Sequence, residues 1–268
     1  MNTLSITTIQ TNLFWEDKQA NLSMLEEKIM GIKEKTNIVV LPEMFSTGFS
    51  MKPEFLAETM DGPTVAWMRG IAKTKGIILT GSVIIEEEGK YFNRLIWMLP
   101  NGQFGVYDKR HCFSLAGEDE HYTGGTKRLI SSVGGWKINL NICYDLRFPV
   151  WTRQVAQTDP EQEPSPEYDV LIYVANWPER RNHAWKTLLQ ARAIENQCFV
   201  FGVNRVGDDG NEIYHSGDSM VVDPLGKVLY QKEHVEDIHT IVIERTLLDE
   251  VRSKFPFWKD ADGFLIAP

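Results

Sequence analysis

The chain has 268 residues, of which 43% are hydrophobic and 24% charged, as in globular proteins that bury a substantial core. Its formal net charge is -9 and it contains no lysine- or arginine-rich run, so we expect neither a nucleic-acid nor a membrane partner. The N-terminus lacks the features of a secretory signal, and no apolar stretch is long enough to span a bilayer. The cysteines Cys112, Cys143 and Cys198 are odd in number and widely separated. This pattern argues against a disulfide framework or a zinc site and favours a cytoplasmic setting.

Strands and helices alternate along the whole chain. Apolar runs and alternating patterns predict strands over 4–9, 37–41, 77–85, 93–99, 104–108, 127–133, 136–142, 170–174, 199–204, 219–223, 227–231 and 240–243. Helical spacing and Gly/Pro signals predict helices over about 16–35, 63–76, 181–196 and 246–253. The acid- and proline-rich segment 158–167 indicates a solvated insertion. Because the alternation continues on both sides of it, we predict a single α/β domain over 1–268, with two layers of sheet and helices outside.

Cys143 is the strongest candidate for chemistry. It follows the apolar run 136–142, and the next residues, Tyr144-Asp145-Leu146-Arg147-Phe148-Pro149, begin a turn into a helix. A thiol at such an elbow is exposed at the sheet edge, and a helix N-terminus there favours its thiolate. The alternative is that Cys143 is a small buried apolar residue, the commonest fate of a free cysteine. Cys112 and Cys198 lack a comparable setting and are assigned to packing.

Glu43 and Lys109 end two other predicted strands. Glu43 directly follows the apolar run 38–42, where an ionisable group rarely stands without a partner. Lys109 follows the strand 104–108, and an ammonium beside a thiol can stabilise an oxyanion. Taken singly, Glu43 could be a surface ion-pair partner and Lys109 part of a solvated face. Together, a carboxylate, an ammonium and a thiol on strand ends predict a cysteine-based acyl-transfer site.

The order of these motifs is specific. Leu41-Pro42-Glu43, then Lys109 with a nearby histidine, then Cys143-Tyr144-Asp145 with Arg147-Phe148-Pro149 resembles the nitrilase superfamily of carbon–nitrogen hydrolases. The likeness continues through 175–178, 192–196 and 217–226, and so covers essentially the whole chain. It implies a four-layer α-β-β-α sandwich of the nitrilase type that dimerises through its outer helices. The expected assembly is therefore a homodimer or a higher homo-oligomer.

The resemblance also implies a second glutamate between the lysine and the cysteine. The loop 114–122 offers three acids, and the spacing to His121-Tyr122 favours Glu118, with Glu120 as the reserve. Residues 44–49 and 108–114 look like the bacterial omega-amidase branch of the superfamily. That branch is similar to enzymes that hydrolyse the side-chain amides of 2-oxoglutaramate and 2-oxosuccinamate. No metal or organic cofactor is expected, and the six histidines show no metal-ligand spacing.

These residues suggest a mechanism for hydrolysis of a small-molecule amide. Cys143 attacks the amide carbonyl, either as the thiolate or with Glu43 taking its proton, and Glu43 returns a proton to the leaving ammonia. The Lys109 ammonium and the backbone N–H of Tyr144 hold the oxyanion, while Glu118 positions Lys109 and the leaving amine. A thioester remains, and water activated by Glu43 hydrolyses it.

A substrate that carries a carboxylate needs a local cation on a chain of net charge -9. Arg147 lies closest to the cysteine in sequence, and Arg180 and Arg181 follow Asn176-Trp177-Pro178. Any of the three arginines could bind the carboxylate, and each could instead be structural. Aromatic side chains are the expected pocket walls. They are Phe45, Phe113, Tyr122 and Trp177.

Other interpretations share some of these residues. A papain-like hydrolase would pair Cys143 with a histidine such as His183 or His215. A nitrilase, an N-carbamoyl amidase or an aliphatic amidase would use the same triad, and a silent binding scaffold would have the same fold. A redox-sensing thiol protein is a further alternative. The aromatic tail 255–268 is expected to pack on the sandwich or on a partner subunit.

Overall fold

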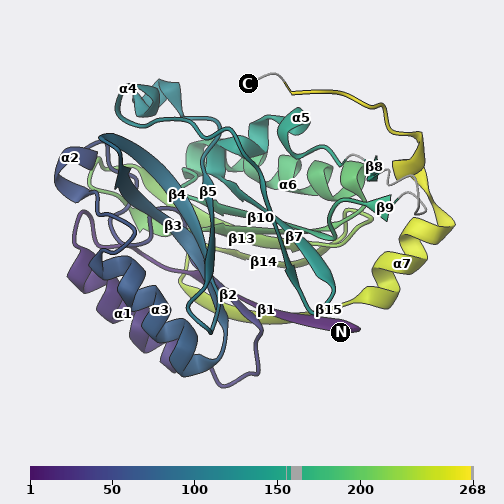
Figure 1. Cartoon of the computed structure of the whole chain (residues 1–268), viewed down its shortest axis with the longest axis horizontal. Helices are drawn as coiled ribbons and strands as arrows, with labels where there is room; N and C mark the ends of the chain where they lie inside the picture. Colours follow the sequence, from purple (N-terminus) through teal and green to yellow (C-terminus); the bar gives the residue numbers. More distant parts are fainter. Residues whose placement is uncertain (155, 158–164, 267–268) are drawn as a thin grey trace.

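The computed structural model, which describes residues 1–154, 156–157 and 165–266, contains two large β-sheets packed face to face between outer helices (Figure 1). A small two-stranded sheet pairs β8 (Ala156–Gln157) with β9 (Ser165–Pro166). The strands of the first sheet are β1 (Thr3–Gln10), β2 (Ile38–Val40), β3 (Ile78–Glu87), β4 (Lys90–Met98), β5 (Phe104–Asp108) and β15 (Asp237–Glu244). Their order is β15-β1-β2-β3-β4-β5. In this sheet β1, β2 and β3 run parallel, while the outer strands are antiparallel to their neighbours.

The second sheet is built around three parallel strands that end near one another. Its strands are β6 (Leu129–Val133), β7 (Trp136–Ile142), β10 (Val170–Ala175), β11 (Phe199–Asn204), β12 (Val206–Asp208), β13 (Tyr214–Val222) and β14 (Val228–Glu233). The order is β12-β13-β11-β10-β7-β6, with β14 paired to β13. Because β7, β10 and β11 are parallel, the segments that follow them leave the sheet at the same edge.

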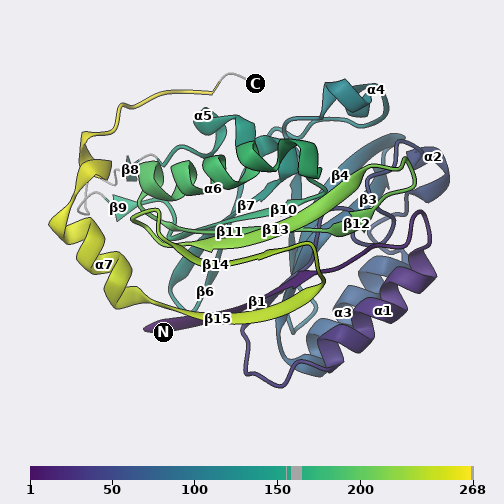
Figure 2. The ribbon, with the colours of Figure 1, turned by 180° about the vertical axis from the view of Figure 1, so that it is seen from behind.

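Helices cover the outer faces of both sheets and close the two ends of the molecule. The longer helices are α1 (Lys18–Met30), α3 (Pro63–Lys75), α6 (Asn182–Asn196) and α7 (Arg245–Lys254). The short ones are α2 (Pro53–Leu56), η1 (Ser114–Ala116), α4 (Glu118–His121), η2 (Cys143–Arg147), α5 (Pro149–Thr152), η3 (Glu179–Arg181) and η4 (Phe257–Asp260). Figures 1 and 2 show α1 and α3 on the first sheet and α6 on the second, with α2 and α4 at the end opposite α7.

Alternation along the strands builds the layers. In β2 and the residue after it, Ile38 and Val40 face the core between the sheets, whereas Val39 and Leu41 face the α1 and α3 layer. A strand that is buried on both faces must be continuously apolar, as this one is. The predicted α-β-β-α sandwich is confirmed. In the described residues no helix combines the length and apolar character that a membrane span requires.

Several element boundaries differ from the prediction. Helix α1 is shorter than the predicted 16–35, because Asp17 caps its start by accepting the Ala20 N–H and the helix ends at Gly31. Strand β13 begins at Tyr214 rather than at 219, since its first half is polar and contains a register shift between Gly217 and Ser219. Part of the predicted loop 158–167, residues 158–164, lies outside the described residues.

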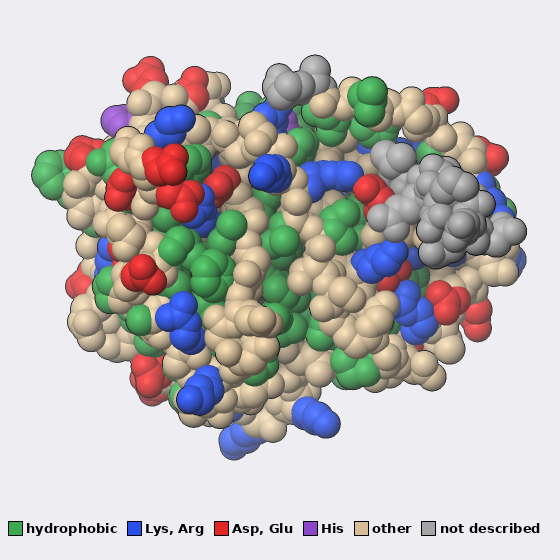
Figure 3. Space-filling model, in the orientation of Figure 1, with side chains coloured by type: hydrophobic (Ala, Val, Ile, Leu, Met, Phe, Trp, Pro, Cys, Tyr) green, Lys and Arg blue, Asp and Glu red, His purple; other side chains and the backbone are tan. Residues whose placement is uncertain are grey.

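The tail that follows α7 is held at its beginning. Gln197 donates its side-chain N–H to the Phe255 carbonyl at 2.7 Å and accepts the Trp258 N–H at 3.2 Å. Beyond that point Phe257 is 63% exposed and Leu265 fully exposed. On the face shown in Figure 3, basic side chains are scattered among acidic and apolar ones.

The close approach of Gly81 on β3 to Phe45 yields a stability prediction. A Cβ atom at Gly81 would lie 2.7 Å from the Phe45 ring and 2.9 Å from the Leu41 Cβ. We expect Gly81→Ala to destabilise the protein by about 1–3 kcal/mol through overpacking. The matched control is Gly70→Ala in α3, where a Cβ meets nothing within 4 Å and should stabilise by about 0.5–1 kcal/mol. Urea unfolding of both variants checks this, and equal midpoints would contradict it.

Candidate active site

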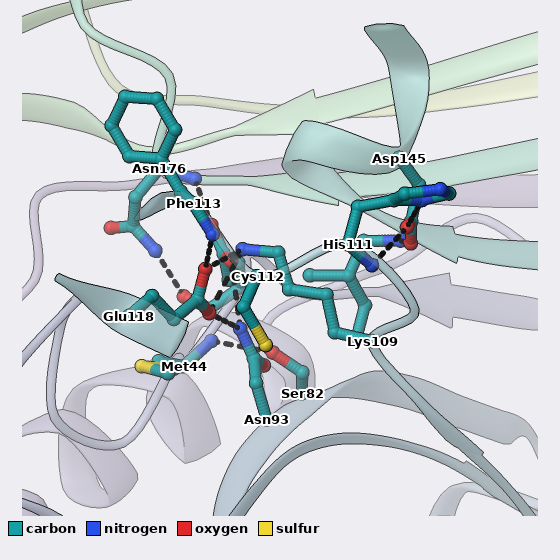
Figure 4. Close-up of polar contacts among 12 residues, drawn as sticks. Met44, Ser82, Asn93, Lys109, His111, Cys112, Phe113, Glu118, Asp145 and Asn176 are labelled. Carbon is teal, nitrogen blue, oxygen red and sulfur yellow. Dashed lines mark hydrogen bonds and ion pairs between the residues drawn. The ribbon is translucent and has the colours of Figure 1, made fainter. Parts of the chain in front are cut away.

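Three charged side chains meet in the interior where β2 and β5 end and α4 begins. Glu43 follows β2, Lys109 follows β5 and Glu118 is the first residue of α4. Each of these side chains is at most 1% exposed. The Lys109 Nζ atom lies 2.8 Å from Glu43 Oε1, 3.0 Å from Glu118 Oε1 and 2.8 Å from Glu118 Oε2 (Figure 4). Residues distant in sequence thus surround one buried ammonium.

The geometry distinguishes the two candidate second glutamates. Glu118 is buried and accepts the Phe113 N–H at 2.5 Å, whereas Glu120 lies exposed on α4. Burial raises the pKa of Glu118, and the charge of Lys109 offsets this only in part because Glu43 opposes it. Burial also disfavours the charged form of Lys109, but the carboxylates of Glu118 and Glu43 outweigh it and raise the pKa of Lys109 well above its ordinary value. Lys109 is therefore a permanent cation at this site.

Two asparagines that the sequence interpretation did not assign to the site complete the cluster. Asn93 on β4 donates its side-chain N–H to Glu43 Oε1 at 2.8 Å and to Glu118 Oε1 at 3.2 Å. Asn176, which follows β10, donates its backbone N–H to Glu43 Oε2 at 2.8 Å and its side-chain N–H to the Glu43 carbonyl at 2.6 Å. Asn176 lies in the motif 175–178, whereas Asn93, a polar residue at the start of the predicted strand 93–99, is identified as a site residue only by its partners in the fold. Both fix the Glu43 carboxylate in place.

Cys143 sits at a sharp elbow, directly after β7 and at the first residue of η2. Its φ angle is 42°, in the left-handed region that residues other than glycine rarely adopt. Strand β7 pairs with β10 in parallel, with Ile142 opposite Val174, so Cys143 and Asn176 leave the sheet at the same edge. Cys143 and Lys109 line one cavity. The elbow thereby turns the thiol towards the charged cluster.

The surroundings of Cys143 favour its protonated form. Burial and then the charge of Glu43 raise the pKa of the Cys143 thiol well above its ordinary value, and Lys109 offsets this only in part. Of the two routes open from the sequence, attack by a resting thiolate or by a thiol whose proton Glu43 takes, this raised pKa favours the second. Cys143 begins a five-residue 3-10 turn in place of a long helix, and so short a turn offers the thiolate little stabilisation against the effect of burial. A protonated thiol needs a base at the moment of attack, and Glu43 is the carboxylate that couples to it.

The cavity at Cys143 has a volume of about 610 Å³. Of the predicted aromatic walls, Phe113 and Trp177 line it, and Phe49 joins them with its ring centroid 5.1 Å from Lys109 Nζ. Phe45 and Tyr122 do not line it, so the prediction that they form cavity walls is wrong. Phe45 is fully buried against Trp67, while Tyr122 is 4% exposed and donates its hydroxyl to the Ser50 carbonyl at 2.6 Å.

The predicted arginines also line this cavity. The Arg147 guanidinium lies 4.9 Å from the Trp177 ring centroid, and the Arg181 guanidinium lies 5.0 Å from that of Phe113. Arg180 is a third lining residue. Within the described residues, none of the three guanidiniums pairs with a carboxylate. Burial and then the neighbouring charge of Arg180 lower the pKa of Arg181, so an anion in the cavity would relieve this repulsion.

Neither histidine that a papain-like scheme would use is paired with the thiol in the described structure. His183 is exposed at the start of α6. His215 lines the cavity, but burial lowers its pKa to about 4 and its Nδ1 atom has no hydrogen-bond partner in the described structure. Neither histidine hydrogen-bonds Cys143 among the described residues. The described residues also contain no group of three or more His, Cys, Asp or Glu side chains that could hold a metal ion.

Comparison with known proteins assigns the family. The carbon-nitrogen hydrolase model matches residues 5–253, and the chain belongs to that family. It is 40% identical over 262 residues to the omega-amidase YafV of Escherichia coli strain K12, covering 97% of this chain and 98% of that one. It is 30% identical over 259 residues to the 2-oxoglutaramate amidase of Bacillus subtilis strain 168, covering 96% of each.

A solved structure shows the same similarity. That of XC1258 from Xanthomonas campestris, a CN-hydrolase superfamily protein with an arsenic adduct in the active site, matches with a TM-score of 0.95 and 42% identity over 100% of both chains. The predicted likeness to the nitrilase superfamily and its omega-amidase branch is confirmed. The chain is a cysteine-dependent amidase that acts on carbon–nitrogen bonds of linear amides.

The charge of Glu43 beside the thiol gives a prediction on pH dependence. In Glu43→Gln the removal of that negative charge lowers the pKa of Cys143, because it no longer opposes the thiolate. Alkylation of Cys143 by iodoacetamide should therefore reach its half-maximal rate at lower pH. Amide hydrolysis should fall about 10²- to 10⁴-fold because the base is lost.

The matched control is Glu58→Gln. Glu58 is also buried, but its carboxylate accepts the Thr64 N–H at the start of α3. This variant should leave the alkylation profile unchanged. An unshifted profile in Glu43→Gln would show that Glu43 does not act on the thiol.

Proposed function

We propose that this protein hydrolyses the ω-amides of small dicarboxylates, 2-oxoglutaramate and 2-oxosuccinamate, to the free acid and ammonia through a thioester on Cys143. The observation that carries the proposal is the set of guanidiniums of Arg147, Arg180 and Arg181, unpaired with carboxylates in the described structure, in the same cavity as the thiol. An amidase for neutral substrates has no need of them. The similarity to the omega-amidase YafV and to the 2-oxoglutaramate amidase supports the same substrate class.

In the acylation half-reaction Glu43 accepts the thiol proton as Cys143 Sγ forms a bond to the amide carbon. The carbonyl oxygen becomes an oxyanion held by the Lys109 ammonium and the Tyr144 backbone N–H. Glu43 then gives the proton to the amide nitrogen, the carbon–nitrogen bond breaks and ammonia leaves. Glu118 holds Lys109 from the other side, which fixes the ammonium for the charge that develops.

In the second half-reaction water enters where ammonia left. Glu43 takes a proton from the water as its oxygen bonds to the thioester carbon, and the same oxyanion donors act again. The carbon–sulfur bond breaks and Cys143 recovers its proton from Glu43. The acid is released and the starting state is restored, with no metal or organic cofactor in the scheme.

The finer points of setting and assembly are also proposals. We expect one catalytic domain over residues 1–268 that works in the cytoplasm as a homodimer or higher homo-oligomer. Three free cysteines fit a reducing compartment. Exposed apolar side chains at Val150 of α5 and Ile194 of α6 support assembly through this outer face. The exposed tail after α7 fits contact with a partner subunit.

Ammonia release from candidate amides tests the function. We expect rapid release from 2-oxoglutaramate and succinamate and little from glutamine, whose α-ammonium would enter a cavity that already holds three guanidiniums. Cys143→Ala should release none, because the acyl group then has no acceptor. The absence of release from every dicarboxylate monoamide would contradict the proposal and direct the search to nitriles, carbamoyl compounds and neutral amides. Release that survives Cys143→Ala would eliminate the thiol as nucleophile.

The arginine assignment has its own test. Arg147→Ala should raise the KM for 2-oxoglutaramate about 10- to 100-fold, the loss of one charge-assisted hydrogen bond, and leave the KM for neutral butyramide unchanged. The matched control is Arg245→Ala, because Arg245 also stacks on a tryptophan, 4.0 Å from the Trp136 ring centroid, at the opposite end of β7. It should change neither KM. An unchanged KM in Arg147→Ala would transfer the role to Arg180 or Arg181.

A further inference from the structure

Asp145 is a buried carboxylate outside the catalytic cluster whose hydrogen bonds converge from two strands. Its side chain is fully buried. Oδ2 accepts the Tyr107 hydroxyl at 2.7 Å and the Ile142 N–H at 3.0 Å. Oδ1 accepts the His111 backbone N–H at 3.1 Å and lies 2.8 Å from the His111 ring Nδ1 (Figure 4). All four contacts of this carboxylate go to donors beside catalytic residues.

The positions of these donors bracket the reacting groups. Tyr107 lies two residues before Lys109 and His111 two residues after it, so the end of β5 is held on both sides. Ile142 is the last residue of β7 and immediately precedes Cys143. One carboxylate therefore connects the strand that carries the ammonium, in the first sheet, to the strand that carries the thiol, in the second.

Neighbouring side chains hold the Tyr107 and His111 donors of Asp145 in place. The Tyr107 hydroxyl also accepts the Trp151 ring N–H at 2.9 Å and the Arg110 backbone N–H at 3.2 Å. The His111 ring is stacked on Phe148, with centroids 3.8 Å apart and planes 7° from parallel. With its donors held in this way, Asp145 accepts in one orientation only.

We propose that Asp145 is a positioning residue, which sets the distance between the Lys109 ammonium and the Cys143 thiol and holds the cysteine in its left-handed conformation. The bond from Ile142 N–H fixes the peptide just before that unfavourable φ angle of 42°. Asp145 touches neither substrate nor reacting atoms and acts through the two strand ends. The kinetic part of the test rests on the proposed function, because it needs an amide that the enzyme turns over.

Asp145→Asn is the informative variant. An amide nitrogen cannot accept a hydrogen bond, so two of the four donors lose their acceptor while the volume stays the same. We expect kcat to fall about 10²-fold, as for a displacement of reacting groups by about 1 Å, with KM within about twofold of wild type. A role in stability alone would lower the melting temperature and leave kcat of the folded enzyme unchanged.

The matched control is Asp169→Asn. Asp169 is likewise buried and accepts from the Lys137 N–H, Arg245 and Arg252, but it precedes β10, at the end of the sheet away from Cys143. This variant should lose stability and keep kcat. If Asp145→Asn does not fold, Tyr107→Phe replaces it, since it keeps the ring and removes the hydroxyl that donates to Asp145 and accepts from Trp151 and Arg110. Its kcat should fall about tenfold.

A readout independent of the substrate completes the test. Alkylation of Cys143 by iodoacetamide, located by mass spectrometry, should be slower in Asp145→Asn than in wild type and Asp169→Asn, because Lys109 then lies farther from the thiol and favours the thiolate less. If the wild type hydrolyses none of the amides but alkylation is still slower in Asp145→Asn, only the proposed function is refuted. The positioning role would be overturned if a folded Asp145→Asn or Tyr107→Phe variant kept both the kcat and the alkylation rate of the wild type.

Discussion

A single buried ammonium holds the site together and constrains the fold around it. Lys109 lies between two carboxylates in an interior where each ion loses several kcal/mol of hydration. The arrangement is stable because the ammonium makes three short contacts and Asn93 donates to both carboxylates. Loss of Lys109 would leave two carboxylates buried side by side with no cation between them. The ends of β2 and β5 and the start of α4 must therefore be in place together, which links folding of the sandwich to assembly of the catalytic residues.

The sequence was enough to predict the layers of the sandwich and the charged residues of the site, because both follow from simple rules. Continuous apolar runs such as β2 are buried on both faces, and an ionisable residue directly after one needs a partner. Asn93 and Asp145 carry no comparable signal, since a polar residue in or after a strand is identified only by its partners across the fold. The predicted wall Phe45 was wrong because Met44 has a φ of 44°, and the turn there directs Phe45 towards Gly81 instead of the cavity.

The state of the thiol shows where local rules fail. A cysteine before a helical turn suggests a stabilised thiolate, but the turn here is short and the sulfur is surrounded by protein. Burial and the Glu43 carboxylate together outweigh the nearby ammonium. The balance depends on three segments that meet only in the folded chain, so no window of sequence contains it. The same three segments provide the base that the protonated thiol requires.

A protonated resting thiol also affects how the enzyme meets oxidants. Hydrogen peroxide oxidises thiolates to sulfenic acid far faster than it oxidises thiols. Burial likewise raises the pKa of Cys112 to about 12 and raises that of Cys198. None of the three sulfurs is thus held as an easily oxidised anion, and the nucleophile is generated only while an amide carbonyl lies beside it. Peroxide should consequently spare this amidase at concentrations that inactivate enzymes whose catalytic cysteine rests as the thiolate.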